Sequence, residues 1–369
     1  MAEVFFLRLM MCPMSEIRIA GITYSCDEIL RKPPPVFASA TPFPHQLYLF
    51  LKEWFSTSPT MRLHTSGSTG APKEITVRKE QMLQSARMTC DFFQLKKGDR
   101  ALLCLPLEYI GGKMMVVRAI CAGLDLYPVA PSGYPLAGGD EQYDFAAMVP
   151  LQVYNSLQTG EEKQRLSQIR QLIIGGGAMD AQLEVALSDF PNKIYATYGM
   201  TETVSHIALR SISGPGTVQY YTPLPGVELS LSDEQTVIIH APRVADAPVV
   251  TNDIGEIRED GTFRILGRKD NVINSGGIKV QAEEVEQILR PYMRGHFAIT
   301  SLPHPKLGEA IVLLIEPEDD PVTTRKTVEQ HLPRYQHPLY ILSVKAIPQT
   351  GSGKTDRAAT RKLAGEMHR

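Results

Sequence analysis

The stretch Leu63-His-Thr-Ser-Gly-Ser-Thr-Gly-Ala-Pro-Lys-Glu-Ile-Thr-Val77 decides how the rest of the sequence is interpreted. Small hydroxyl residues, two glycines and Lys73 lie between two short apolar runs, which predicts a strand, a loop and a second strand. Such a loop can bind phosphate, because glycine backbone approaches oxyanions closely while hydroxyl and ammonium groups donate hydrogen bonds. The loop does not fit the Walker A pattern. A solvated Ser/Gly linker would have a similar composition.

The segment from Thr65 to Lys73 resembles the phosphate loop of the adenylate-forming superfamily, which contains acyl-CoA synthetases, peptide-synthetase adenylation domains and luciferases. With the later motifs, the resemblance covers residues 60–357. It implies ATP-binding roles for Thr65, Ser66, Gly67, Ser68, Thr69, Gly70 and Lys73. Members of this superfamily usually carry a longer segment before the loop, so we expect a shortened amino-terminal part.

The composition indicates a globular protein without a strongly charged surface. With 38 basic and 40 acidic side chains the net charge is −2, so nucleic acid and membrane surfaces are not expected partners. The five cysteines form no Cys-x-x-Cys pair, and we expect reduced thiols without a disulfide or a zinc site. No apolar run reaches the roughly 18 residues of a membrane helix. We therefore expect a cytoplasmic protein, and a homodimer is compatible with the sequence.

Strands and helices alternate after the loop. Apolar patterning predicts helices at 79–93, 151–157 and 179–187 and strands at 101–105, 124–128, 145–149 and 171–174. Short strands separated by turns follow between 226 and 266. These patterns predict an α/β fold with a largely parallel sheet and a β-rich subdomain, and a small α+β domain over 271–369. The resemblance implies a large domain over 1–267, a hinge over 268–270 that includes Asp270, and a mobile carboxy-terminal domain.

A second motif is Tyr198-Gly-Met-Thr-Glu202. Tyr198 can stack on a purine, Thr201 can donate to a phosphate or carboxylate oxygen, and Glu202 can hold Mg²⁺. A strand followed by a capping threonine and a surface glutamate would give the same pattern. The motif resembles the second signature of the superfamily, which implies ATP-binding roles for Tyr198, Gly199, Met200 and Thr201 and a metal-binding role for Glu202.

Two further segments are candidate nucleotide contacts. The run Gly175-Gly-Gly-Ala178 follows a predicted strand, where backbone can approach a flat ring, although such runs are also common in tight turns. The resemblance implies that Gly176, Gly177 and Ala178 line the adenine and acyl pocket. Thr251-Asn-Asp-Ile-Gly255 resembles the family's Thr-Gly-Asp-x-Gly, with Asn252 in place of glycine. Asp253 can accept hydrogen bonds from both ribose hydroxyls or cap a turn, and Arg268 is a candidate for nucleotide hydroxyl and phosphate contacts.

The segment from Leu105 to Arg118 resembles the stretch that leads into the acyl pocket in the family, but this chain has Glu108 and Tyr109 where the family often has an aromatic residue and a histidine. Lys113 and Arg118 lie in an otherwise apolar run and could bind a second carboxylate of the substrate. Alternatively, both cations extend to the surface. His206 can face the acyl group or serve as a hydrogen-bonded structural histidine.

The last motif is Ile347-Pro-Gln-Thr-Gly-Ser-Gly-Lys-Thr355. It is not a P-loop, because Pro348 occupies the place of the first Walker glycine. The family uses this motif to deliver a lysine to a reaction centre on another domain, which implies a catalytic role for Lys354. A surface-loop lysine is the alternative. The resemblance also implies that Gly276 and Gly277 line the path of the CoA pantetheine.

The resemblance implies an ATP-dependent acid–CoA ligase. A carboxylic acid would attack the α-phosphate of ATP with Mg²⁺ bound, giving an acyl-adenylate and pyrophosphate, and CoA would then displace AMP. The resemblance implies o-succinylbenzoate, an aromatic dicarboxylic acid, as the substrate, and another aryl or acyl acid is the alternative. An adenylation module that loads a carrier-protein thiol and a catalytically inactive binding protein are the alternatives.

Overall fold

The computed structural model describes residues 15–34, 37, 42–64, 74–139, 141–177, 179, 181–214, 219–349 and 355–368. Its largest element is a nine-stranded sheet in the order β11-β10-β9-β8-β7-β5-β6-β1-β2. The strands are β1 (Glu16–Ile19), β2 (Ile22–Ser25), β5 (Arg100–Leu103), β6 (Asp125–Pro128), β7 (Phe145–Met148), β8 (Gln171–Ile174), β9 (Lys193–Gly199), β10 (His206–Ser211) and β11 (Thr222–Pro223). The pairs from β1 to β9 through β6, β5, β7 and β8 are parallel, which confirms the predicted largely parallel sheet.

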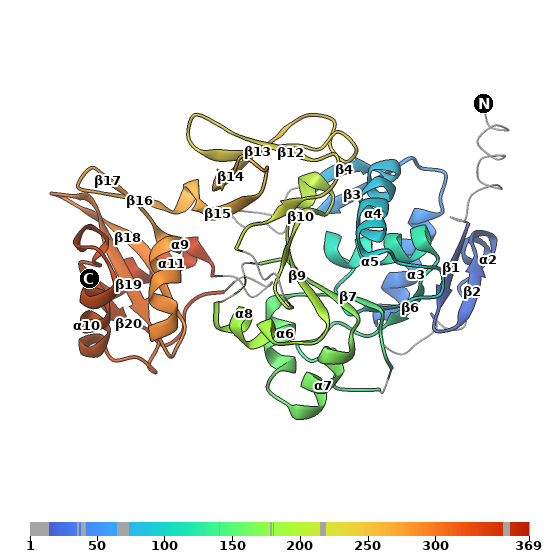
Figure 1. The fold of residues 1–369 in the computed structure, drawn as a ribbon, viewed down its shortest axis with the longest axis horizontal. Coiled ribbons are helices and arrows are strands. Elements are labelled where there is room, and N and C mark those ends of the chain that lie inside the picture. The colour runs from blue at the N-terminus through green and yellow to red at the C-terminus, as the bar shows by residue number, and fades with distance from the viewer. Residues whose placement is uncertain are drawn as a thin grey trace.

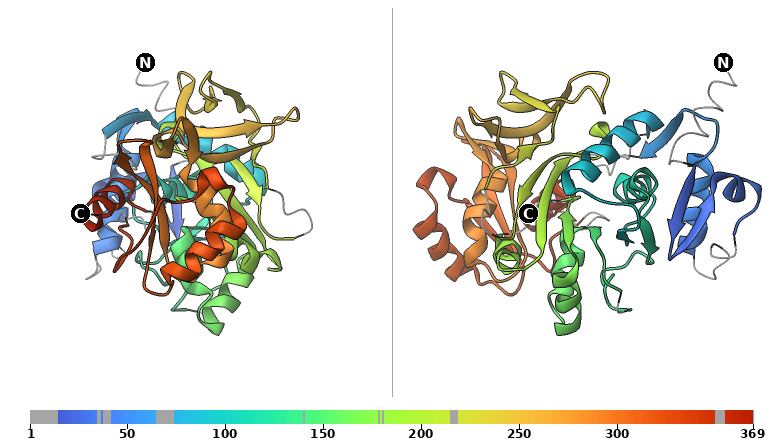
Figure 2. Two further views of the ribbon diagram at one scale, coloured as in Figure 1. Left: turned by 90° about the vertical axis from the view of Figure 1, so that its left-hand side faces the viewer. Right: turned by 45° about the vertical axis from the view of Figure 1, so that its right-hand side comes forward.

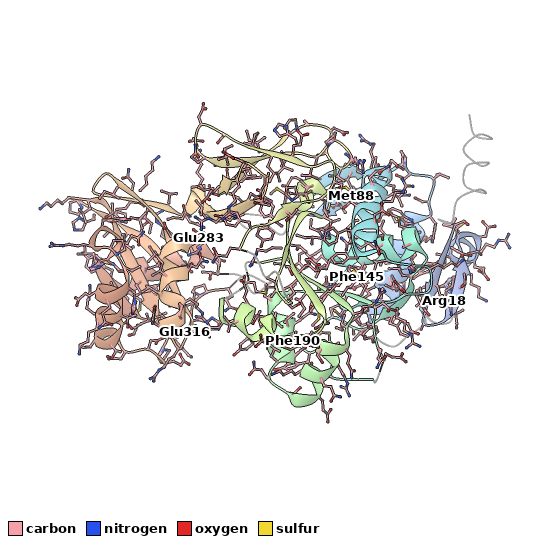
Figure 3. The ribbon with its side chains drawn as sticks, in the orientation of Figure 1. Arg18, Met88, Phe145, Phe190, Glu283 and Glu316 are labelled. Atoms are coloured by element: carbon pink, nitrogen blue, oxygen red, sulfur yellow. The ribbon has the colours of Figure 1, made fainter. Side chains whose placement is uncertain are left out.

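Helices cover both faces of this sheet. Successive residues of its central strands point to opposite sides, so both faces carry apolar side chains that must be buried. Ala101 and Leu103 belong to one hydrophobic core, whereas Leu102 belongs to another. Phe145 and Phe190, labelled in Figure 3, lie in the first and second core, respectively. The first core includes residues of α2 (Cys26–Arg31), α3 (Pro42–Trp54), α4 (Lys79–Phe93) and α5 (Ile110–Ala122). The second includes residues of α6 (Pro150–Ser156), α7 (Gly160–Gln168) and α8 (Ala181–Ser188).

A two-stranded antiparallel hairpin consists of β3 (Thr60–His64) and β4 (Glu74–Arg78). Its strands pair in register from Thr60 opposite Arg78 to His64 opposite Glu74. The two strands predicted on either side of the Ser/Thr/Gly-rich loop are therefore confirmed, and residues 65–73 lie outside the described residues.

The β-rich segment forms a separate antiparallel sheet at the top of Figure 1. Its strands are β12 (Glu228–Leu231), β13 (Thr236–His240), β14 (Val249–Ile257) and β15 (Phe263–Arg268), in sequence order. The 3₁₀ helix η3 (Lys269–Asn271) leads from β15 into the carboxy-terminal part of the chain.

The carboxy-terminal part contains β16 (Val272–Ser275), β17 (Ile278–Gln281), β18 (Phe297–His304), β19 (Gly308–Ile315) and β20 (Tyr340–Ser343) in one sheet. Residues of α9 (Ala282–Leu289) and α10 (Pro321–His331) pack in one core of this sheet, and residues of α11 (Arg357–Met367) pack in the other. The 3₁₀ helices η4 (Arg290–Tyr292) and η5 (Arg334–Gln336) complete it. Figures 1 and 2 show these elements together at one end of the molecule.

The predicted helix at 79–93 is confirmed to the residue. Helix α7 was not predicted, because its sequence Gly160-Glu-Glu-Lys-Gln-Arg-Leu-Ser-Gln168 has one large apolar residue and no apolar stripe. The helix begins where the Thr159 side chain accepts a hydrogen bond from the Glu162 N–H. Within the described ranges, no helix combines the length and apolarity needed to cross a membrane.

Candidate active site

Three residues from separate sequence motifs meet at the carboxyl end of β9. The Tyr198 hydroxyl donates to Asp253 Oδ2 at 2.8 Å, and Arg268 Nη1 donates to Asp253 Oδ1 at 3.2 Å. Burial is the main cause that raises the pKa of Tyr198, and the adjacent Asp253 carboxylate raises it further, so the phenol stays protonated at neutral pH. One carboxylate is thus held between a phenol and a guanidinium, with Tyr198 on β9, Asp253 on β14 and Arg268 at the end of β15.

Arg268 also connects this carboxylate to the predicted hinge. Its Nη2 donates to Asp270 Oδ2 at 3.1 Å, and the Asn252 amide donates to the same oxygen at 3.1 Å. Arg268 Nε is buried and has no partner among the described residues. A buried donor without an acceptor is costly, so this nitrogen is an unusual feature of the structure.

The turn after β9 is narrow and held by side-chain hydrogen bonds. A Cβ at Gly199 would overlap the carbonyl oxygen of Ser205. Thr203, in the 3₁₀ helix η2 (Thr201–Thr203), accepts from the Met200 N–H at 3.1 Å and donates to the Ser205 carbonyl at 2.8 Å. Val204 is buried with φ 66° and ψ −45°, a conformation that a β-branched residue adopts only under strain. The turn leaves Thr201 buried and Glu202 exposed.

The predicted glycine run lies beside this turn. Strand β8 ends at Ile174 and pairs in parallel with β9, so Gly176 and Gly177 follow the same edge of the sheet as Tyr198. Gly176 has φ +85°, which favours glycine. Ala178 lies outside the described residues. Ligands of open α/β sheets bind at this edge, where the parallel strands end.

Arg118 is 1% exposed and lies on the inner face of α5, so the alternative of a surface position is wrong for this cation. Its Nη2 donates to the Ser205 hydroxyl at 2.8 Å, and Nη1 lies 3.7 Å from the Met115 sulfur. Nε has no partner, and no carboxylate of the described residues pairs with the guanidinium. Burial lowers the pKa of Arg118 to about 10, so it remains a cation at neutral pH. Buried charges in proteins are usually paired with an opposite charge, and this one has no such partner among the described residues.

His206 lies next to this cation. Its Nε2 is 3.1 Å from Thr89 Oγ1, and its Nδ1 is 3.5 Å from Ser205 Oγ. Because Thr89 donates to the Ser85 carbonyl at 3.2 Å, it accepts from Nε2–H, and Nδ1 accepts from Ser205. Burial, followed by the Arg118 charge, lowers the pKa of His206 well below 6.5 and keeps it neutral.

Lys113 and Tyr109, the other candidate residues of the acyl segment, form no hydrogen bond with Arg118 or His206 within the described part of the chain. Lys113 is half-buried and donates to the Arg62 carbonyl of β3 at 3.4 Å. Burial lowers the pKa of Lys113. Tyr109 precedes α5 as its N-cap residue. Lys113 and Arg118 therefore contact different parts of the structure, and only Arg118 joins the buried polar cluster.

Gly276 and Gly277 form the exposed turn between β16 and β17, with φ +62° and +84°. This hairpin extends away from the nine-stranded sheet (Figure 1), so the structure does not bring the two glycines to Tyr198 and Asp253. The candidate residues Thr65, Ser66, Gly67, Ser68, Thr69, Gly70, Lys73 and Lys354 lie outside the described residues.

The described residues are compatible with one Mg²⁺ ion whose ligands come mainly from the nucleotide phosphates and water. They contain no group of three His, Cys, Asp or Glu side chains that could hold a metal ion by themselves. The exposed carboxylate of Glu202 follows the end of β9, where it can supply one oxygen ligand. In nucleotide sites Mg²⁺ is commonly bound by one or two carboxylates, phosphate oxygens and water.

Sequence inspection did not single out Thr89 or Ser205, which hold His206 and Arg118. Thr89 lies on α4, remote in sequence from the other three residues, and no motif marks it. Ser205 follows the second motif directly, and this proximity was the only available signal.

The fold and these sites define an adenylate-forming enzyme. Residues 50–252 match the model of the AMP-binding enzyme family, and the chain belongs to this family. A crystal structure of an acyl-CoA synthetase (AMP-forming)/AMP-acid ligase II-like protein from Dyadobacter fermentans is 34% identical, with a TM-score of 0.61 and coverage of 91% of this chain and 96% of that one. The o-succinylbenzoate CoA synthetase (MenE) from Bacillus subtilis, in complex with ATP and magnesium ion, has the same fold at 21% identity, with a TM-score of 0.68 and coverage of 80% and 68%.

Curated relatives share lower identity over most of the chain. The 2-succinylbenzoate–CoA ligase of Listeria monocytogenes is 26% identical over 83% of this chain and 70% of its own length. The corresponding ligase of Escherichia coli is 27% identical over 83% and 69%. A probable 2-succinylbenzoate–CoA ligase of Mycobacterium tuberculosis is 28% identical over 82% and 84%.

Proposed function

We propose that this protein is an ATP-dependent acid–CoA ligase that adenylates a carboxylic acid and transfers the acyl group to CoA. The observation that carries the proposal is the meeting of Tyr198, Asp253 and Arg268 at the carboxyl end of β9. A purine can stack on the tyrosine ring while ribose hydroxyls donate to the Asp253 carboxylate. The unpartnered Arg268 Nε can then donate to a nucleotide oxygen.

In the proposed first step, the substrate carboxylate attacks the α-phosphate and pyrophosphate leaves. The loop from Thr65 to Lys73 would bind the departing pyrophosphate, and Lys354 would stabilise the charge that develops between the carboxylate and the α-phosphate. Glu202 would hold Mg²⁺, which neutralises phosphate charge when it is bound. Thr201 would position a phosphate or carboxylate oxygen from its buried place in the turn.

In the proposed second step, the CoA thiolate attacks the acyl carbon and AMP leaves. Lys354 must withdraw before CoA enters, so residues 271–369 would rotate about a hinge at 268–270. The outward position of Gly276 and Gly277 supports this motion, because the β16–β17 turn needs a rotation to reach the nucleotide site. The division into a large domain over 1–267 and a mobile domain over 271–369 is part of the proposal.

We propose o-succinylbenzoate as the acid. This aromatic keto acid carries two carboxylates, one for adenylation and one for recognition. The buried Arg118 guanidinium, with no carboxylate partner among the described residues, is suited to bind the second carboxylate. The names of the curated relatives support the same substrate. The neutral His206 would line the pocket beside the acyl group.

The test is a panel of aromatic and aliphatic acids, including o-succinylbenzoate and benzoate, assayed for acid-dependent AMP formation with and without CoA. We expect AMP turnover only with CoA, and the highest kcat/KM with o-succinylbenzoate. Preference for a monocarboxylic acid would indicate another aryl- or acyl-CoA ligase. Turnover with a phosphopantetheine-bearing carrier protein but not with CoA would indicate an adenylation module, and the lack of pyrophosphate release with every acid would refute the proposal.

The Lys354→Ala variant separates the two half-reactions. We expect it to abolish most acid-dependent ATP–pyrophosphate exchange while it largely retains thioester formation from a supplied acyl-adenylate. Equal loss of both reactions would refute the proposed rotation.

We further propose a cytoplasmic location and a homodimer. Cell fractionation would test the location, and light scattering of the purified protein would test the oligomeric state.

A further inference from the structure

A half-buried ion pair lies at the start of α11, three residues after Lys354 in the sequence. Arg357 Nη1 donates to Glu286 Oε1 at 2.6 Å, and Nη2 donates to Oε2 at 2.7 Å. Both groups also bind the backbone of one residue in β18, since the Ile299 N–H donates to Glu286 at 2.7 Å and the Ile299 carbonyl accepts from Arg357 at 3.1 Å. This two-point contact fixes Arg357 against α9 and β18.

The two flanks of the segment that carries Lys354 are paired with each other. Gln349 and Thr355 form an antiparallel bridge, and the Asp356 N–H donates to the Pro348 carbonyl at 2.9 Å. The Asp356 side chain caps α11 by accepting from the Ala359 N–H at 3.0 Å. Because Arg357 follows directly, its ion pair holds the base of this segment in place.

Glu283 connects the same ion pair to the hinge. One of its oxygens lies 3.7 Å from Arg357 Nη2 and accepts from the Asn271 amide. The other oxygen accepts from the Gln281 amide at 2.5 Å, and that amide also donates to the Arg268 carbonyl at 3.0 Å. Glu283 lies on the side of the carboxy-terminal elements that faces the rest of the molecule (Figure 3).

The hinge backbone fits closely against Gln281. A Cβ at Gly267 would overlap the Gln281 side chain, so only glycine leaves room for the amide that binds Arg268. A continuous series of side chains therefore runs from the backbone at 267–268 through Gln281 and Glu283 to Arg357.

We propose that Gln281, Glu283, Glu286 and Arg357 are positioning residues that couple the orientation of the hinge to the placement of Lys354. The proposal rests on the proposed function, in which Lys354 acts only in adenylation. Side-chain contacts connect the Arg268 carbonyl through Gln281 and Glu283 to Arg357, so the orientation of the hinge backbone affects the base of the segment that carries Lys354. Since transition-state stabilisation depends on placement within about an ångström, loosening this connection impairs adenylation and spares thioester formation.

The test compares Glu283→Gln with Arg361→Met in the full-length protein. Glu283→Gln retains the shape of the side chain but removes its negative charge beside Arg357. The second is a matched control on the same helix, because Arg361 is half-exposed and pairs with Glu309, away from this series. ATP–pyrophosphate exchange reports adenylation, and conversion of a supplied acyl-adenylate by CoA reports the second half-reaction.

We expect Glu283→Gln to lower the rate of exchange by about tenfold or more, with the second half-reaction within about threefold of wild type and Arg361→Met unchanged in both. Gln281→Met, which removes the contact with the Arg268 carbonyl at similar volume, should give the same split if Glu283→Gln does not fold. A parallel fall in both half-reactions, or no change in either, would overturn the inference.

Lys354→Ala in the same two assays distinguishes this inference from the proposed function. If Lys354→Ala loses exchange and neither Glu283→Gln nor Gln281→Met does, only the coupling is refuted. If Lys354→Ala retains exchange, the proposed role of Lys354 is refuted, and the coupling is refuted with it.

Discussion

Replacing Arg118 with methionine should make the free protein as stable as wild type or more stable, and should remove recognition of a second carboxylate. The guanidinium is almost fully buried, and its only close polar partners among the described residues are the Ser205 hydroxyl and the Met115 sulfur. Methionine has a similar length and no charge, so it can occupy the same space without the cost of burying an ion.

The lowered pKa of Arg118 indicates the approximate size of that cost. Burial lowers this pKa to about 10. Relative to an ordinary value of about 12.5, this corresponds to roughly 3 kcal/mol, at about 1.4 kcal/mol per pH unit. The hydrogen bond to Ser205 offsets about 1.5–3 kcal/mol of this. Arg118→Met should therefore change the free energy of unfolding by between zero and about +2 kcal/mol.

Arg118→Met should impair the reaction of o-succinylbenzoate although it does not destabilise the protein. Removing one partner of a buried charge pair costs about 2–5 kcal/mol, so kcat/KM for o-succinylbenzoate should fall by roughly 30-fold to several thousand-fold. The value for benzoate, which lacks a second carboxylate, should change little. Urea unfolding gives the stability, and AMP formation with the two acids gives the specificity. Lys97→Met, at an exposed cation beside Glu16, is the control.

Two results would refute this reasoning. If Arg118→Met lowered the free energy of unfolding by more than about 2 kcal/mol, the guanidinium would have a structural role. If kcat/KM for the two acids fell by the same factor, Arg118 would not recognise the second carboxylate.

Three further predictions concern other parts of the site. The pKa of His206 is lower in the folded chain than in the unfolded chain, so the unfolded chain binds an extra proton below about pH 6.5. The contribution of neutral His206 to the free energy of unfolding is then fully present above that pH, and it falls by about 1.4 kcal/mol per pH unit below it. Urea unfolding between pH 7 and 5 should show a shallower loss for His206→Gln, and equal slopes would contradict this.

Asn252→Gly removes a hydrogen bond to Asp270 worth roughly 1 kcal/mol, so trypsin should cleave the hinge after residues 268 and 269 about fivefold faster; an unchanged cleavage rate would count against this contact. Gly199→Ala places a methyl group against the Ser205 carbonyl and should destabilise the protein by about 1–3 kcal/mol, measured by thermal unfolding. A melting temperature equal to that of wild type would show that the turn can relax.

Local patterning was sufficient for most secondary structure. Helix α4 repeats apolar residues with a helical period, and β8 is a short apolar run that ends in glycines, so both follow from neighbouring residues. Helix α7 has no apolar stripe, and its stability comes from Leu166 in the second core and from its cap, which local patterning does not display.

The sequence by itself determined the class of fold and the order of the motifs, because spacing and residue type within each short segment carry that information. Tertiary structure decided which distant residues meet. It brought Tyr198 and Arg268 to the Asp253 carboxylate, and it buried Arg118 while the Lys113 side chain bonded to the Arg62 carbonyl of β3. The physical reason is that burial and hydrogen-bond partners depend on how sheets and helices pack over long sequence separations, which periodicity along the chain does not encode.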